Sequence, residues 1–188
     1  MIGTHLRGHV IITLERFANV FALTGILTVL LMASVLQFVL HELPCPLCLL
    51  QRIGFFCMAL GFLLNIRVGF HPRHYSMVLM GSLFTALVAL RQVALHIVPG
   101  SGAYGDAFLG LHLYTWAFVL CMTMMGVTAI LLGFKRQYKP VIYVSTSWRV
   151  CGHIMLACTI ALLLINIGST FLECGFSACP ESPTTYHW

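Results

Sequence analysis

Five apolar segments, each about as long as a membrane-spanning helix, constrain this chain more than any other feature of its sequence. A helix needs about 20 mostly apolar residues to cross the hydrocarbon core of a bilayer. The segments cover about residues 17–40, 48–66, 76–98, 109–134 and 150–172. We therefore expect five transmembrane helices. The residues before Arg16 are compatible with a short interfacial helix.

The composition agrees with a membrane protein and disfavours other classes. Hydrophobic residues make up 60% of the 188 residues and charged residues only 8%, whereas a soluble domain carries about 25% charged residues. The net charge of +5 is no indication of nucleic-acid binding, because basic residues in a membrane protein report its topology. The first segment is too long for the apolar region of a signal peptide. No linker or repeat divides the chain, so we expect one all-α membrane domain over residues 1–188.

The positions of Lys and Arg predict the orientation in the membrane. The loops of about residues 41–47 and 99–108, and the tail after the fifth segment, contain neither residue. Because Lys and Arg concentrate in cytoplasmic loops, we expect a cytoplasmic N-terminus and a C-terminus on the outer face. Eight of the ten basic residues fall on the cytoplasmic side if all five segments span: Arg7, Arg16, Arg67, Arg73, Lys135, Arg136, Lys139 and Arg149.

The other two basic residues, Arg52 and Arg91, lie within apolar segments near the outer face. A charge at the centre of the membrane costs about 2.5 kcal/mol or more, and less near the interface. Such side chains commonly face a partner inside the protein. The alternative is that each one snorkels to the outer headgroups.

A Cys-x-x-Cys motif occupies the first outer loop. Cys45 and Cys48 are separated by Pro46 and Leu47, a spacing at which a disulfide closes and reopens with little motion. If the second helix begins near Cys48, the positive end of its dipole favours a thiolate there. Arg52 follows one helical turn later on the same face. These residues predict a redox-active disulfide.

Three other interpretations of this pair are open. It could be an inert structural disulfide, because the outer face of the membrane is oxidising. It could be half of a metal site, although His41 is the only nearby ligand and no second pair has the spacing of a zinc site. The two thiols could also be buried as small apolar residues, which the flanking prolines and the loop position disfavour.

A second pair, Cys174 and Cys179, lies in the tail after the fifth segment, on the outer side in this topology. A disulfide can close the short loop between them, which contains Gly175. This pair could be a structural bridge that anchors the tail, or a second redox pair that reaches a soluble partner. The other cysteines lie in or beside apolar segments, where thiols usually pack as core residues: Cys57, Cys121, Cys151 and Cys158.

Three stretches resemble the disulfide bond formation protein B (DsbB) family, the quinone-coupled oxidases of the bacterial inner membrane. Cys45–Arg52 resembles the first-loop motif, including the arginine four residues after the second cysteine. Arg91–Leu95 resembles the family's Arg-x-Val-x-Leu stretch, and Leu109–Trp116 its Leu-Gly-Leu start followed by tryptophan. The resemblance covers about residues 10–134, a four-helix core. Residues 135–188 add a cytoplasmic loop, the fifth span and the cysteine-containing tail.

The resemblance implies roles for the motif. Cys48 matches the cysteine that meets the quinone, Cys45 the one that exchanges with a second pair, and Arg52 the arginine needed for productive quinone binding. The quinone is ubiquinone or menaquinone. The implied partner is a periplasmic, thioredoxin-fold thiol oxidase of the DsbA type.

Other side chains are candidates for the quinone site. Arg91, His96 and His112 are candidates for binding carbonyl oxygens or relaying protons. His112 and Trp116 are expected on one helix face, at i and i+4, near the outer end of the fourth span. The alternative for the histidines is a packed or interfacial role, and for Trp116 simple packing.

Two features depart from the family's pattern. The family carries its second cysteine pair in a long loop between the third and fourth spans, whereas here Pro99–Phe108 is short and has no cysteine. The chain also has a fifth span, followed by Cys174 and Cys179. We therefore expect the tail pair to replace the missing loop pair.

These observations predict a membrane thiol:quinone oxidoreductase that re-oxidises a periplasmic dithiol partner and supports disulfide bond formation. Two alternatives remain open. One is a non-catalytic membrane subunit or assembly partner in which both pairs are static. The other is a reductase that carries electrons outward, which a low reduction potential of the Cys45–Cys48 pair would favour.

Overall fold

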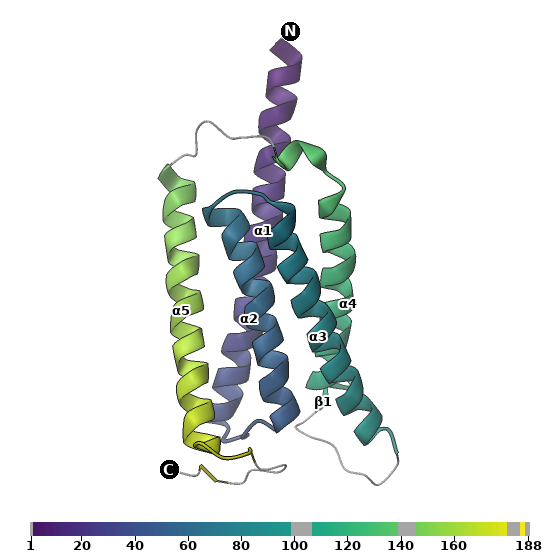
Figure 1. Cartoon of the computed structure of the whole chain (residues 1–188), viewed down its shortest axis with the longest axis vertical. Coiled ribbons are helices and arrows are strands. Elements are labelled where there is room, and N and C mark those ends of the chain that lie inside the picture. Colours follow the sequence, from purple (N-terminus) through teal and green to yellow (C-terminus); the bar gives the residue numbers. More distant parts are fainter. Residues whose placement is uncertain (1, 99–106, 139–145, 180–184, 187–188) are drawn as a thin grey trace.

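The computed structural model describes residues 2–98, 107–138, 146–179 and 185–186. Helices dominate this part of the chain, with one two-stranded hairpin between the third and fourth of them (Figure 1). The elements are α1 (Ile2–Val39), α2 (Pro46–Arg67), α3 (Pro72–His96), β1 (Ala107–Phe108), β2 (Leu111–His112), α4 (Leu113–Leu132), the 3-10 helix η1 (Lys135–Tyr138) and α5 (Thr146–Cys174).

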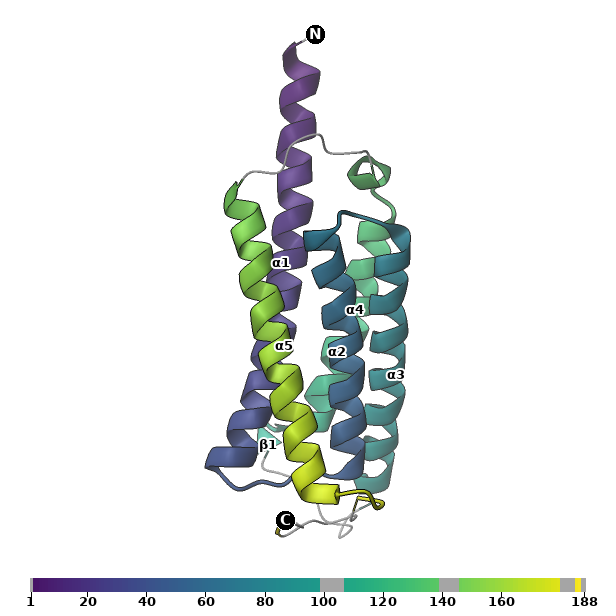
Figure 2. The ribbon, with the colours of Figure 1, turned by 60° about the vertical axis from the view of Figure 1, so that its left-hand side comes forward.

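The five α-helices are the five spans that the apolar segments predict, and each is long and apolar enough to cross a membrane. They run roughly along one axis, with the two chain ends at opposite ends of the bundle (Figures 1 and 2). Helix α2 packs against α1, α3 and α5; α4 packs on the other side of α3, and α5 also contacts α1. The chain is therefore a multi-pass helical membrane protein. It forms a four-helix bundle, and the fifth helix runs along the bundle and packs against α1 and α2.

Prolines set the starts of α2 and α3. Pro46 and Pro72 each occupy the first turn of their helix, where the missing N–H costs no intrahelical hydrogen bond. The residue before each proline is extended and acts as the N-cap. His71 accepts a hydrogen bond from the backbone N–H of Arg73 at 3.2 Å, and Cys45 is the corresponding cap of α2.

Glycines allow α2 and α3 to approach closely. A Cβ added to Gly81 would lie 2.8 Å from the backbone oxygen of Gly54, and one added to Gly61 would lie 2.6 Å from the backbone oxygen of His74. A Cβ at Gly54 would overlap Thr85 Oγ1. Small residues are the usual means by which helices pack tightly in a membrane. This contact fixes α3 beside the start of α2, where the Cys-x-x-Cys motif lies.

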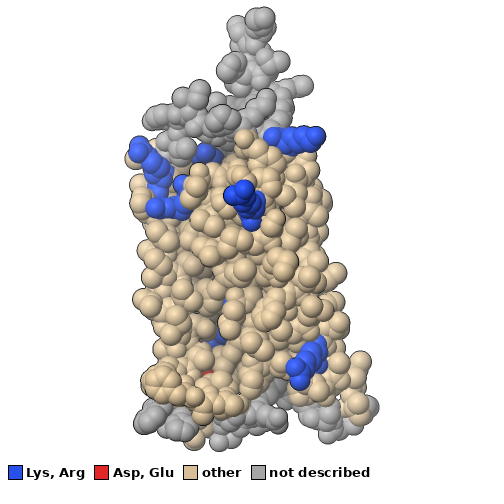
Figure 3. Space-filling view, viewed as in Figure 1, with Lys and Arg blue, Asp and Glu red and all other residues tan. Residues whose placement is uncertain are grey.

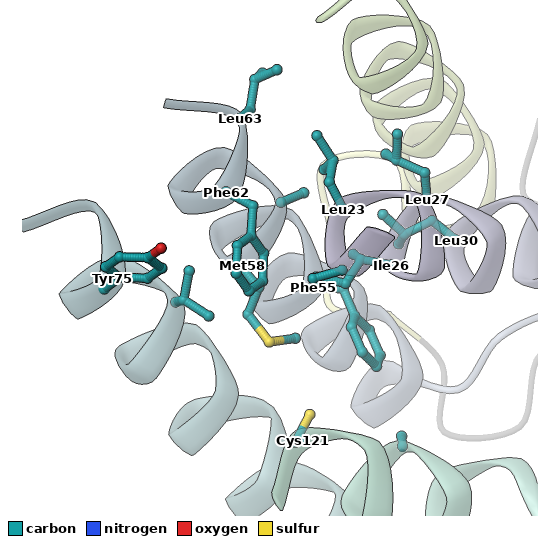
Figure 4. Close-up of a cluster of buried hydrophobic side chains, with 14 of the residues drawn as sticks. Leu23, Ile26, Leu27, Leu30, Phe55, Met58, Phe62, Leu63, Tyr75 and Cys121 are labelled. Atoms are coloured by element: carbon teal, nitrogen blue, oxygen red, sulfur yellow. The ribbon is translucent and has the colours of Figure 1, made fainter. Parts of the chain in front are cut away.

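The apolar core lies where α1, α2, α3 and α4 meet (Figure 4). Leu23 and Ile26 of α1 face Met58 and Phe62 of α2, and all four are fully buried. Cys121 of α4 is also fully buried and carries no disulfide, so its thiol packs as a core residue. Large apolar side chains also cover the outside of the bundle, as expected for a surface that meets lipid: Phe21, Leu87, Ile130 and Leu164 are among them.

Basic side chains gather mainly toward the end of the bundle that carries the N-terminus, and the middle of the visible face has almost none (Figure 3). Arg67, Arg73, Lys135 and Arg149 are exposed and belong to this basic end. Of the predicted basic set, Lys139 lies outside the described residues. The start of α2 and the end of α5 lie at the opposite end (Figure 1).

The start of the fourth span differs from the prediction. The expected helix from Leu109 begins only at Leu113, because Leu109 and Gly110 both have positive φ, 51° and 81°. These angles suit the two-residue turn of a tight hairpin, and Phe108 pairs with Leu111 across it. His112 is consequently the N-cap of α4 and does not share a helix face with Trp116. At the other end of the chain, α1 is continuous from Ile2, so no separate interfacial helix precedes Arg16.

A buried polar network ties the helices together near the basic end. The Asn19 amide donates to the Tyr75 hydroxyl at 2.9 Å, and Asn65 donates to Asn19 at 3.0 Å. Tyr75 in turn donates to Gln137 of η1 at 2.9 Å. Hydrogen bonds of this kind satisfy polar groups that lipid cannot. They hold α1, α2, α3 and η1 in register, far from the cysteine motif.

Candidate functional site

A disulfide joins Cys45 and Cys48 at the N-terminus of α2, with their Cα atoms 5.0 Å apart. Cys45 is the N-cap, and its sulfur accepts a hydrogen bond from the backbone N–H of Cys48 at 3.2 Å. Cys45 is buried and Cys48 is half-buried. Both sulfurs therefore sit at the positive end of a helix dipole, which stabilises a thiolate when the disulfide opens. Cys48 is the more accessible of the two.

A glutamine from α3 contacts both sulfurs. Gln92 Nε2 lies 3.3 Å from Cys45 Sγ and 3.6 Å from Cys48 Sγ, in position to donate. Its side-chain oxygen accepts a hydrogen bond from Gln51 Nε2 at 2.7 Å, and both glutamines are buried. Gln51 thus fixes the orientation of the Gln92 amide. An N–H directed at sulfur stabilises negative charge there.

Arg52 lies one turn further along α2 and is 93% buried, with 7% of its surface exposed. Its guanidinium donates to Gln37 Oε1 at 2.7 Å and to the backbone oxygen of Ala33 at 3.1 Å. Both acceptors belong to α1. Arg52 is therefore held inside the bundle by hydrogen bonds, as the partner interpretation predicts, and does not extend to the outer headgroups.

The second disulfide closes the end of α5. Cys174 and Cys179 are joined, with their Cα atoms 4.6 Å apart, and Gly175 between them takes a left-handed φ of 59° that ends the helix. Cys174 is buried and Cys179 is half-buried. Glu173 beside Cys174 interacts electrostatically with Arg52. The tail disulfide and the motif disulfide thus lie at the same end of the bundle, as expected.

The other predicted quinone-site residues lie on α3 and around the hairpin. Arg91 is exposed on α3, one residue before buried Gln92. His112 stacks on Tyr114 with ring centroids 5.3 Å apart, and His96 lies 5.7 Å from the same ring. Trp116 donates to the backbone oxygen of Phe108 at 2.8 Å, which ties α4 to the hairpin. The sulfur contacts from α3 come from Gln92 and not from Arg91.

A family model matches this part of the chain. Residues 15–104 match the model described as disulfide bond formation protein DsbB. This match supports membership of the DsbB family. No curated protein and no solved structure matches it significantly.

The DsbB match indicates a membrane oxidoreductase of disulfide bond formation. The matched residues contain the Cys45–Cys48 disulfide, Arg52 and Gln92. Helices α4 and α5 and the Cys174–Cys179 disulfide lie beyond the DsbB match. The redox site at the start of α2 is therefore built from the DsbB part of the chain, while the tail pair is an addition to it.

Sequence reasoning missed four polar side chains of this site, namely Gln37, Gln51, Gln92 and Glu173. All four are buried inside apolar helices. Their signal was available, because a polar residue in a transmembrane segment usually faces the protein interior. Gln92 lies within the Arg91–Leu95 stretch that resembles DsbB, directly after Arg91, which was the predicted site residue.

Proposed function

We propose that this DsbB-family protein is a thiol:quinone oxidoreductase of the bacterial inner membrane. It re-oxidises a periplasmic, thioredoxin-fold thiol oxidase and passes the electrons through Cys45 and Cys48 to a membrane quinone. The observation that carries the proposal is the surroundings of the Cys45–Cys48 disulfide. A helix N-terminus, the Gln92 amide and a buried arginine one turn away all favour a thiolate at this disulfide.

The residues around Arg52 fit a quinone headgroup. Gln37 Nε2 and the Tyr186 hydroxyl are buried donors without a hydrogen-bond partner among the described residues. Gln37 accepts a hydrogen bond from Arg52 through its amide oxygen, which leaves the Nε2 donor free for a ligand. Carbonyl oxygens accept hydrogen bonds from such donors. A bound quinone would supply an acceptor for two electrons and two protons.

Electrons enter, in this proposal, through the tail pair. Cys179 is its more exposed sulfur, so a partner thiolate attacks there and releases the Cys174 thiol. The second partner thiol then resolves the mixed disulfide. The Cys174 and Cys179 thiols next reduce Cys45–Cys48 by the same exchange, and Cys174–Cys179 closes again. Each exchange transfers two electrons and conserves the number of disulfides.

Arg91, His112 and Trp116 remain proposals for the edge of the quinone site. Arg91 is exposed and available to an anionic or carbonyl group at the membrane surface. The His96 and His112 rings lie 5.7 and 5.3 Å from the Tyr114 ring and offer nitrogen atoms that can hydrogen-bond to a carbonyl oxygen. Trp116 donates a hydrogen bond to the backbone oxygen of Phe108 in the hairpin.

The redox state of Cys45 in cells tests the proposed function. Acid-quenched thiol trapping should find both reduced and oxidised Cys45, and withholding quinone should shift the pair toward the reduced form. The reason is that a shuttle fills with electrons when its acceptor is absent. Cys121, buried and free, serves as a thiol whose state should not respond.

A Cys45–Cys48 pair that stays fully oxidised under both conditions would contradict the proposal. That result would favour a non-catalytic membrane subunit with two static disulfides. A pair that becomes more oxidised when quinone is withheld would indicate electron flow in the opposite direction.

A further inference from the structure

Glu173, near the C-terminal end of α5, is a buried acidic residue without a hydrogen-bond partner in the part of the chain that the structure describes. Only 1% of its surface is exposed. Both of its side-chain oxygens lack a partner among the described residues. A buried carboxylate normally accepts several hydrogen bonds, because burial removes its water. Glu173 therefore needs an explanation beyond packing.

The charged group that acts on Glu173 is Arg52. The attraction is between Arg52 of α2 and Glu173 of α5. It involves no direct hydrogen bond, since Arg52 donates to Gln37 and Ala33 of α1. Arg52 is thus hydrogen-bonded to α1 and lies within electrostatic reach of an acidic residue on α5.

The Cys48 thiolate is a second negative group that Arg52 can stabilise, besides the Glu173 carboxylate. Cys48 precedes it by four residues on α2, so the two side chains lie on one helix face. A low-dielectric site that holds one cation stabilises one anion far better than two. A Cys48 thiolate and a Glu173 carboxylate therefore compete for the same positive charge. Moving one proton between them keeps the net charge of the site unchanged.

We propose that Glu173 accepts the thiol proton of Cys48 when the reduced site is oxidised. This inference rests on the proposed function and adds a residue to it from α5, outside the residues that match the DsbB model. Glu173 is a carboxylate before the transfer and a carboxylic acid after it. Arg52 correspondingly exchanges an interaction with the carboxylate for one with the thiolate.

The protons and electrons balance over one turnover. The reduced site holds two thiols, Cys45 and Cys48. Closing the disulfide forms one S–S bond and releases two electrons and two protons, all of which leave to the quinone of the proposed function. The Cys48 proton passes by way of Glu173, which returns to the carboxylate form, and the other proton comes from the Cys45 thiol.

Glu173→Gln separates this role from a structural one. Glutamine keeps the shape of the side chain but is neutral and accepts no proton. We expect quinol formation, driven by a small dithiol, to fall by about 100-fold, the lower end of the range of general acid–base effects. Glu173→Asp should recover part of the rate. Glu42→Gln is the matched control, because Glu42 is a half-buried carboxylate of the outer loop with no place in the proposed transfer.

A second readout needs no quinone. Cys48 alkylation is followed against pH in full-length protein carrying Cys45→Ser, Cys174→Ser and Cys179→Ser. In the Glu173→Gln variant, alkylation should reach half its maximal rate at a lower pH, because no carboxylate competes with the Cys48 thiolate for Arg52. More thiolate together with slower quinol formation is a combination that a loss of structure does not produce.

The outcomes separate the two proposals. If wild-type protein reduces quinone and Glu173→Gln turns over like Glu42→Gln, the role of Glu173 is wrong and the proposed function stands. Slower turnover with an unchanged alkylation profile also overturns the proton transfer, because Glu173 then acts only on structure. If wild-type protein reduces no quinone, the proposed function fails, and the proton transfer in turnover fails with it.

Discussion

Cys48→Ser should abolish quinone reduction in the purified protein, whether a partner or a small dithiol supplies the electrons. The Cys48 sulfur is half-buried at the start of α2 and faces the Gln92 amide. A serine hydroxyl neither forms a disulfide with Cys45 nor ionises at neutral pH. We expect the rate to fall by about 1,000-fold or more, because the two sulfurs act as a unit and their effects do not add.

Cys158→Ser is the matched control for this variant. Cys158 is a free thiol exposed on α5, so its replacement makes the same chemical change away from the redox site. The rate of quinol formation should equal that of wild type. Unchanged quinone reduction in Cys48→Ser would refute the assignment of the site, whatever the control shows.

Replacing Cys174 and Cys179 together with serine should separate two ways of supplying electrons. Partner-driven quinone reduction should stop, because the partner then lacks the half-buried Cys179 sulfur that it attacks. Reduction by a small dithiol should continue at close to the wild-type rate, because such a molecule reaches the half-buried Cys48 sulfur directly. The measurement is quinol formation with each electron donor in turn.

The single variants extend this experiment. Cys174→Ser leaves Cys179 as a free thiol with no disulfide for the reduced partner to attack, so partner-driven quinone reduction should stop in this variant as well. Partner-driven turnover that persists in the double variant would mean that the Cys174–Cys179 disulfide only anchors the tail to the end of α5.

The spans were predictable because hydropathy and length alone determine them. The predicted second span began at Cys48, and α2 begins at Pro46, since proline is well suited to the first turn of a helix. The fourth span was placed four residues early. Leu109 has a left-handed φ of 51°, which nothing about a leucine signals, and the resulting hairpin removes His112 from the helix.

The cysteine motif and Arg52 were predictable because their spacing already puts them on one face of a helix end. The positions of Gln92 and Glu173 at this site could not be predicted, because they depend on how α3 and α5 are rotated about their axes relative to α2. In a membrane helix, apolar residues cover both the lipid-facing and the buried sides, so hydrophobic periodicity gives little information on rotation. The buried positions of α5 show what to look for instead, since Thr159, Asn166, Ser169 and Glu173 form a polar stripe toward the bundle.

A single turnover without any partner tests most directly whether Cys45 and Cys48 pass electrons to quinone. Full-length protein carrying Cys174→Ser and Cys179→Ser is reduced with a small dithiol, freed of it, and mixed with quinone in the absence of oxygen. We predict one quinol for each Cys45–Cys48 disulfide that closes, because one disulfide releases two electrons. Disulfide closure without quinol, or quinol formation while Cys45 and Cys48 stay reduced, would contradict the proposed electron path.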